Sequence, residues 1–118
     1  MDDTSHDIEL LRRWAASKPI VERVWIFGSR ARGTNRPDSD LDVAVQHGLK
    51  RGDSNLFTTG LSEPSAWRAE LQPKARLTLD IQSYIPGDTP TVEAGLNESS
   101  RLIYEKPPNK SCMDSSRK

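Results

Sequence analysis

Two short segments alternate strictly between apolar and polar residues, and this pattern limits the chain to a sheet whose two faces differ. In 40–46 the apolar face carries Leu41, Val43 and Val45, and in 75–84 the same alternation recurs around "LTLDIQ". Successive side chains of a strand point to opposite faces, so each apolar set is complete without the acidic residues. If the strands are neighbours, the aspartates gather on the face that helices do not cover. These are Asp40, Asp42 and Asp80.

The remaining segments predict the elements around this sheet. A buried strand at 20–27 ends at Gly28, a turn lies at 86–88, and 101–105 forms a last strand. Ser62-Glu63-Pro64 opens the second helix, after a loop from His47 to about Ser62. Thr4 and Asp7 form a capping box for the first helix. The three expected helices span 4–17, 62–72 and 89–98. We expect an α/β (α+β) fold, a small mixed sheet with helices packed on one face and a metal site on the other.

Length and composition favour one small domain. The chain has 118 residues, of which 1–105 would form the domain and 106–118, rich in Pro and Ser, a disordered tail. Its 17 basic and 17 acidic residues cancel, which gives no general attraction to nucleic acid or to a membrane surface. The single cysteine, Cys112, and the absence of a signal peptide or spanning segment predict a cytoplasmic protein.

The three aspartates predict a metal site. Three carboxylates on one face repel one another, and this repulsion raises at least one pKa unless a cation lies among them. Hard divalent ions with oxygen ligands, Mg²⁺ above all, suit such a cluster. Two metal ions held by shared carboxylates are a known arrangement for in-line attack on phosphorus. An isolated Asp-x-Asp pair is more often an exposed strand edge, so its context matters.

Gly28 and Ser29 provide that context. A strand that runs into a glycine and then into a helix start leaves backbone N–H groups for phosphate oxygens. Ser29 adds a hydroxyl, and Arg30, Arg32 and Arg36 add positive charge, although each of these arginines could equally be a solvated surface residue. No Gly-Lys-Ser/Thr follows, so this is not a Walker loop. His47 is interpreted as a surface loop histidine.

The segment "GSRARGTNRPDSDLD" resembles the nucleotidyltransferase superfamily that includes DNA polymerase beta and the kanamycin nucleotidyltransferases, and most closely the minimal nucleotidyltransferases. Their pattern is Gly-Ser, ten residues, then Asp-x-Asp, with a third carboxylate on a later strand. The resemblance implies that Asp40 and Asp42 hold two Mg²⁺ ions and that Asp80 completes the metal nearest the nucleophile. It further implies that Gly28 and Ser29 bind the terminal phosphates of ATP, with Arg32 as another phosphate contact.

The resemblance also implies a reaction and a partner. The expected reaction transfers a nucleoside monophosphate, AMP from ATP, to a hydroxyl. Minimal nucleotidyltransferases commonly act beside a helical HEPN-type protein, and as antitoxins they attach AMP to a tyrosine of that RNase toxin. Two alternatives remain: transfer to a small molecule such as an aminoglycoside with a partner subunit, and a binding-only antitoxin without catalysis. A homo-oligomer, the nucleotide base and the acceptor are left open.

Overall fold

Four strands form one mixed sheet in the computed structural model, which describes residues 3–33, 39–50 and 52–107. The sheet order is β3-β2-β1-β4; β2 and β3 run parallel, and the other neighbouring pairs are antiparallel. The parallel pairing places the two alternating segments side by side, which is the condition for the expected gathering of aspartates on one face. The strands are β1 (Val21–Phe27), β2 (Leu41–His47), β3 (Leu79–Tyr84) and β4 (Ser100–Glu105).

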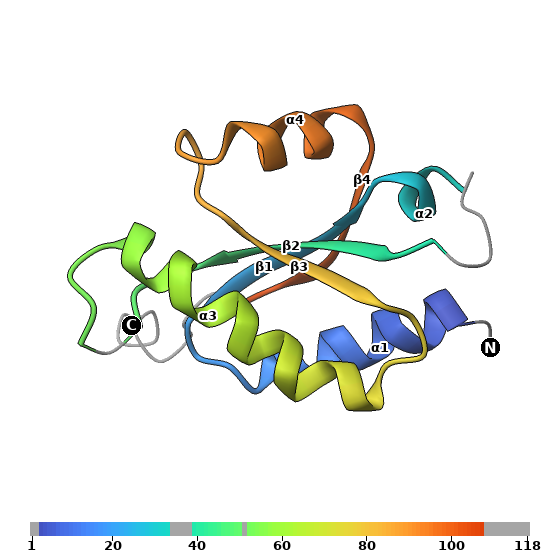
Figure 1. The fold of residues 1–118 in the computed structure, drawn as a ribbon, viewed down its shortest axis with the longest axis horizontal. Helices are drawn as coiled ribbons and strands as arrows, with labels where there is room; N and C mark the ends of the chain where they lie inside the picture. The colour runs from blue at the N-terminus through green and yellow to red at the C-terminus, as the bar shows by residue number, and fades with distance from the viewer. Residues whose placement is uncertain (1–2, 34–38, 51, 108–118) are drawn as a thin grey trace, which may run out of the picture.

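Helices cover the two faces of this sheet unequally (Figure 1). The long helices α1 (Asp3–Ala16) and α3 (Leu56–Leu71) pack on one face, over the main apolar core. The short helix α4 (Pro90–Glu98) lies over part of the other face, where Val92 packs with Phe27 and Ala44. The expected mixed sheet with one helix-packed face is therefore confirmed, with a small additional cover. No helix among the described residues is long and apolar enough to cross a membrane.

The main core contains the apolar faces that the sequence indicates. Leu41, Val43 and Val45 are fully buried, and Leu79 is 1% exposed. The rings of Trp14 on α1 and Trp67 on α3 meet edge to face, with centroids 5.5 Å apart, a preferred aromatic geometry. This core fixes which face of β2 and β3 remains available for polar side chains. Those are Asp42 and Gln46 on β2, and Asp80 and Gln82 on β3.

Helix α3 begins earlier than the sequence predicts. The expected loop to about Ser62 is wrong, because α3 starts at Leu56 and is capped by Asn55, whose side-chain oxygen accepts a hydrogen bond from the Thr58 N–H at 2.9 Å. Pro64, expected near the helix start, lies inside α3. The helix ends at Leu71 and continues as a 3-10 turn, η1 (Gln72–Lys74).

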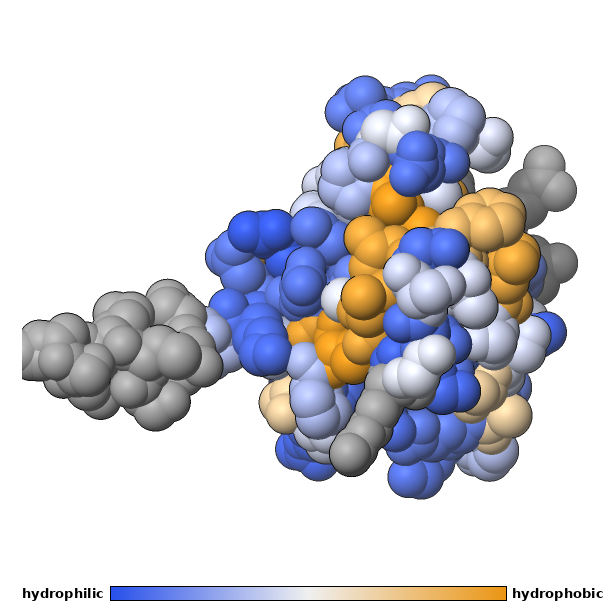
Figure 2. Space-filling model, turned by 90° about the vertical axis from the view of Figure 1, so that its left-hand side faces the viewer, coloured by the Kyte–Doolittle hydropathy of each residue, from blue (hydrophilic) through white to orange (hydrophobic). Residues whose placement is uncertain are grey.

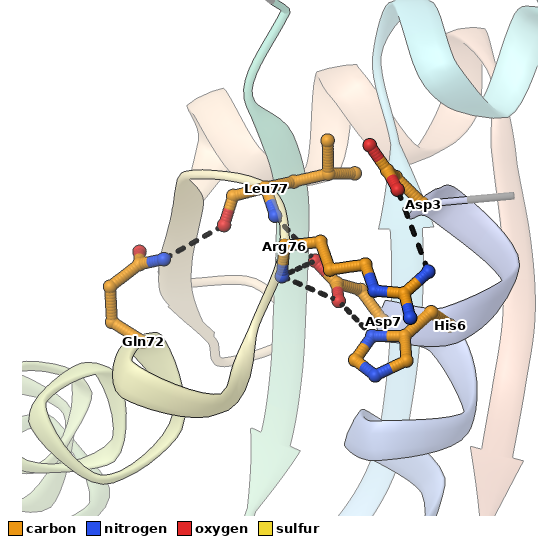
Figure 3. A network of polar contacts seen from close by, with 6 residues as sticks. All are labelled: Asp3, His6, Asp7, Gln72, Arg76 and Leu77. Atoms are coloured by element: carbon orange, nitrogen blue, oxygen red, sulfur yellow. Dashed lines mark hydrogen bonds and ion pairs between the residues drawn. The ribbon is translucent and has the colours of Figure 1, made fainter.

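Strand β3 starts later than expected, and Asp7 organises the segment before it (Figure 3). The Asp7 carboxylate is fully buried and accepts hydrogen bonds from the backbone N–H groups of Arg76 and Leu77, at 2.9 and 2.8 Å. His6 contacts the same carboxylate. The predicted capping box is wrong, since α1 already includes Asp3 and Asp7 binds a distant segment instead.

The prediction for His47 is also wrong. Its side chain is 3% exposed at the end of β2 and contacts Trp67 of α3 edge to face. The Gly48 carbonyl, 2.9 Å from Nδ1, can only accept a hydrogen bond, so Nδ1 carries the proton. Nε2 lies 2.6 Å from the Ser83 hydroxyl oxygen, within hydrogen-bond distance. His47 therefore links β2 to β3 inside the core and does not face the aspartates.

Candidate active site

The turn after β1 requires a glycine for two reasons. Gly28 has φ +76° and ψ −156°, a conformation that residues with a side chain rarely adopt. A Cβ atom at this position would also collide with the carboxylate of Asp42. Ser29 follows immediately and opens the short helix α2 (Ser29–Arg32). The predicted phosphate-binding pair therefore lies directly against one of the predicted metal ligands.

Sheet register brings the acidic residues to the same place. Asp42 is the register partner of Phe27 on β1 and of Asp80 on β3. The glycine turn, Asp42 and Asp80 thus come from three neighbouring strands at one end of the sheet. Asp40 immediately precedes β2 and is exposed. The expected gathering of carboxylates on this face is present for Asp42 and Asp80, with Asp40 beside them.

The pKa of Asp42 is raised by its burial and by the neighbouring carboxylates. Its pKa is raised from 3.8 to about 6, first because partial burial disfavours the charged form. The negative charge of Asp80, a hydrogen bond that protonated Asp42 donates to Asp80, and the charge of Asp40 raise the pKa further. A cation placed among these oxygens would reverse the effect, because it favours the charged form.

The carboxylate oxygens of this site are ligands that suit a hard divalent cation. Their arrangement, however, does not form a complete metal site. Among residues 3–33, 39–50 and 52–107, no group of three His, Cys, Asp or Glu side chains is placed to hold a metal ion. Asp42 and Asp80 form the close pair, and Asp40 contributes charge from the chain just before β2. The assignment of all three as metal ligands therefore stays a prediction.

The arginines of the motif have different surroundings. Arg30 is 9% exposed; its Nε donates to the Ser39 carbonyl at 3.0 Å, and Nη1 donates to the Thr4 hydroxyl at 2.9 Å. Arg30 thus holds the chain next to Asp40 against α1, a structural role. The side chain of Arg32 and the whole of Arg36 lie outside the described residues, so the predicted phosphate contact of Arg32 stays a prediction.

A polar recess lies next to the carboxylates, and the sequence did not indicate it. The recess has a volume of about 440 Å³ and is lined by Asp40 and Asp80 together with Ser65 and Arg68 of α3 and Thr78. Arg68 and Ser65 are exposed side chains on α3, whose buried residues face the core. Their spacing carries no motif, and only the packing of α3 beside β3 brings them to this position.

Comparison with protein families identifies the domain. A sequence model described as "Polymerase beta, Nucleotidyltransferase" matches residues 9–109. Together with the fold, this match defines the protein as a nucleotidyltransferase domain. More narrowly, the chain belongs to the polymerase beta nucleotidyltransferase family. No curated protein matches the sequence.

Solved structures share the fold at low sequence identity. A putative nucleotidyltransferase from Sulfolobus solfataricus is 22% identical, with a TM-score of 0.53 over 88% of this chain and 81% of that one. A toxin–antitoxin structure with AMP-PNP is 16% identical, with a TM-score of 0.52 over 97% and 82% of the two chains. A mutant MntA–HpeT toxin–antitoxin structure is 14% identical, with a TM-score of 0.51 over 98% and 82%. These likenesses confirm the nucleotidyltransferase fold.

Proposed function

We propose that this chain transfers AMP from ATP to an acceptor hydroxyl in a reaction that requires Mg²⁺. The observation that carries the proposal is the register pair Asp42 and Asp80, which lies beside the Gly28 turn in a domain of this family. In the reaction, the acceptor oxygen bonds to the α-phosphorus of ATP, and the bond from that phosphorus to the bridging oxygen breaks. Pyrophosphate leaves, and the hydroxyl proton passes to a nearby base or to water.

The residues have distinct roles in this proposal. Gly28 and Ser29 bind the terminal phosphates through backbone N–H groups and the Ser29 hydroxyl, with Arg32 as a further phosphate contact. Asp40 and Asp42 would hold two Mg²⁺ ions, and Asp80 would complete the coordination of the ion nearest the acceptor. The bound metal ions would neutralise phosphate charge and polarise the reacting oxygens. Catalysis then comes mainly from positioning and electrostatic stabilisation.

We further propose that the acceptor is a tyrosine of a HEPN-type RNase toxin and that this chain is its antitoxin. Two observations support this choice. The sequence resembles minimal nucleotidyltransferases, and the fold is like that of chains in toxin–antitoxin structures, one of which contains AMP-PNP. An AMP group on a toxin tyrosine adds bulk and negative charge, which would oppose binding of the RNA backbone.

Ligand-dependent melting tests the nucleotide and metal part of the proposal. Mg²⁺ with ATP should raise the melting temperature of the wild-type chain by mass action, and EDTA should abolish the rise. Asp42→Asn and Asp80→Asn should each lose the rise. Asp88→Asn is the matched control, because Asp88 is an exposed residue in the turn after β3. An unchanged rise in the Asp42 and Asp80 variants would place the nucleotide elsewhere.

An assay of AMP transfer tests which acceptor the chain uses. Wild-type chain, Mg²⁺ and labelled ATP are incubated with the protein encoded by the neighbouring gene, and intact-mass analysis measures the AMP added. We expect one AMP mass for each modified hydroxyl, located on tyrosine. Labelling only of an added aminoglycoside would favour a small-molecule acceptor, and neutralisation of the partner without labelling would favour a binding-only antitoxin.

A further inference from the structure

An apolar groove follows the outer edge of β3, on the side away from β2. It has a volume of about 400 Å³, and helix α3, the end of β3 and the start of α4 line it. Figure 2 shows apolar side chains gathered in the middle of this end of the molecule. We call this feature the β3-edge groove; its main apolar residues are Phe57, Leu61, Pro64, Ile81, Ile85 and Val92.

The groove is bordered by the most exposed large apolar side chains of the described residues. Phe57 is 63% exposed and Leu61 is 69% exposed. They lie four residues apart on α3, so both point to the same side of the helix. A compact apolar region of this kind, next to a concave surface, is typical of a site that binds another molecule.

Backbone groups along the same edge are also available. The Thr78 carbonyl accepts from the Leu41 N–H, so it points toward β2. Backbone groups alternate in direction along a strand, and Leu79, Ile81 and Ser83 therefore point outward. The Leu79 N–H donates to the Gln72 side chain at 2.9 Å. No hydrogen bond to the backbone of Ile81 or Ser83 from this outer side is found within the described part of the chain.

The two edges of the sheet differ in this respect. On β4, the opposite edge, the Ile103 carbonyl accepts a hydrogen bond from Arg12 at 2.8 Å, and Arg101 and Glu105 add charge to the strand. Charges and side-chain bonds of this kind protect edge strands from pairing with other chains. Gln72 protects only the beginning of β3, so Ile81, which is 8% exposed, and the half-buried Ser83 keep outward backbone groups that have no hydrogen-bond partner among the described residues.

The groove continues into the active site. Pro64 and Ile81 line both the β3-edge groove and the polar recess that contains Asp40 and Asp80. A segment paired with Ser83 and Ile81 would reach the level of Asp80 within roughly three residues, since each extended residue spans about 3.3 Å. The outer edge of β3 thus leads from apolar surface to the carboxylate proposed to lie nearest the acceptor.

From this arrangement we propose that the acceptor hydroxyl is presented by an extended segment of the partner protein, which adds to the sheet as a strand along the outer edge of β3. The inference rests on the proposed function. Alternate apolar side chains of the segment occupy the β3-edge groove, and its backbone pairs with Ile81 and Ser83. The acceptor residue follows within about three positions and lies in the polar recess.

Paired surface variants test the docking site. Leu61→Glu should reduce AMP transfer to the neighbouring gene's product at least tenfold, while the melting-temperature rise with Mg²⁺ and ATP is unchanged. The matched control is Leu102→Glu, because Leu102 is 48% exposed on the opposite edge strand β4. Equal transfer by both variants would overturn the proposal. Absence of transfer by the wild type would instead contradict the proposed function.

Residue-resolved amide exchange tests the docking mode without catalysis. In the isolated chain, the N–H groups of Ile81 and Ser83 should exchange rapidly, and a complex with the unlabelled partner should slow both at least tenfold. Protection of Phe57 and Leu61 alone would indicate a docked helix and overturn strand addition. If the N–H groups of Ile81 and Ser83 are protected without the partner, and more strongly at higher concentrations of this chain, a second copy of this chain lies at the edge.

Discussion

Asp42 and Asp80 are register partners in the one parallel strand pair of the described sheet, so two carboxylates lie side by side on its polar face. The Gly28 turn confines Asp42 from the other side. This arrangement is unfavourable in the metal-free protein, because both burial and like charge oppose ionisation of Asp42. It becomes favourable when a cation binds, and the same geometry therefore supports the proposed metal site.

Stability of the metal-free protein should depend on the ionisation of Asp42. Its pKa is about 6 in the folded state against 3.8 for the unperturbed group, so the folded chain binds more protons between these values. The free energy of unfolding should therefore fall as pH rises from about 4 to 6 and stay lower above that window. Asp42→Asn should remove this fall, and thermal melts in EDTA across the window measure it.

At pH above 6 the same variant should be more stable than the wild type. Solvent reaches part of the site, so we expect a gain of only about 1 kcal/mol, which corresponds to a few degrees in melting temperature. Asp88→Asn, in an exposed turn, should leave the pH dependence as it is. A large loss of stability in Asp42→Asn would mean that the carboxylate has a structural role.

Gly28 should be more sensitive to substitution than Gly33. Both have positive φ, but Gly33 has ψ +15°, the left-handed region that alanine adopts at a cost of roughly 1–2 kcal/mol, whereas Gly28 has ψ −156°, a region that is essentially restricted to glycine. Only at Gly28 does the added Cβ collide with Asp42, whereas no described atom lies within 4 Å of a Cβ at Gly33. Gly28→Ala should therefore lower the melting temperature more than Gly33→Ala does.

A double variant isolates the collision. In Gly28→Ala/Asp42→Ala the Asp42 carboxylate is absent, so the glycine change should cost less than it does beside Asp42, and the cost that remains is the backbone strain at Gly28. Equal melting temperatures for the two single glycine variants would show that Gly28 does not confine Asp42. The two glycine variants, melted side by side, provide the measurement.

The sequence predicted the elements whose information is local. Strict alternation identified β2 and the second half of 75–84 and indicated the faces on which Asp42 and Asp80 lie. The spacing from Gly28-Ser29 to Asp40 identified the family through resemblance. These signals depend on strand periodicity and on a short motif, and neither requires knowledge of distant contacts.

The features that were missed depend on tertiary structure. The early start of α3 was missed because Thr58, Thr59 and Gly60 are poor helix formers and Pro64 resembled a helix start. Packing against β3 compensates: a Cβ at Gly60 would lie 2.6 Å from the Ser83 hydroxyl oxygen, so glycine permits the close approach of α3. The burial of His47 and the presence of α3 side chains in the polar recess likewise depend on the position of α3.

Asp7 should stabilise the fold, and it should affect the active site only by holding the segment that leads into β3. Its buried carboxylate accepts hydrogen bonds from the Arg76 and Leu77 N–H groups, so Asp7→Asn leaves at least one donor poorly satisfied. We expect a loss of about 1–3 kcal/mol, measured by urea unfolding. Asp3→Asn is the control, because the ion pair of Asp3 with Arg76 is long, at 3.7 Å, and exposed. Equal stability of the two variants would contradict this role.

The acidic pair should separate catalysis from binding. Asp42→Asn/Asp80→Asn retains the shape of both side chains and leaves the β3-edge groove unchanged, so the complex with the partner should still form. Without the carboxylates the metal ions are not held, and AMP transfer should fall by at least two orders of magnitude. If the chain is a catalytic antitoxin, this variant binds the partner yet fails to suppress its RNase activity.

Co-purification, intact mass and RNA cleavage, measured on one preparation, distinguish the outcomes. Full suppression by the unreactive variant would mean that contact alone neutralises the partner, and loss of co-purification would mean that the carboxylates themselves hold the complex together.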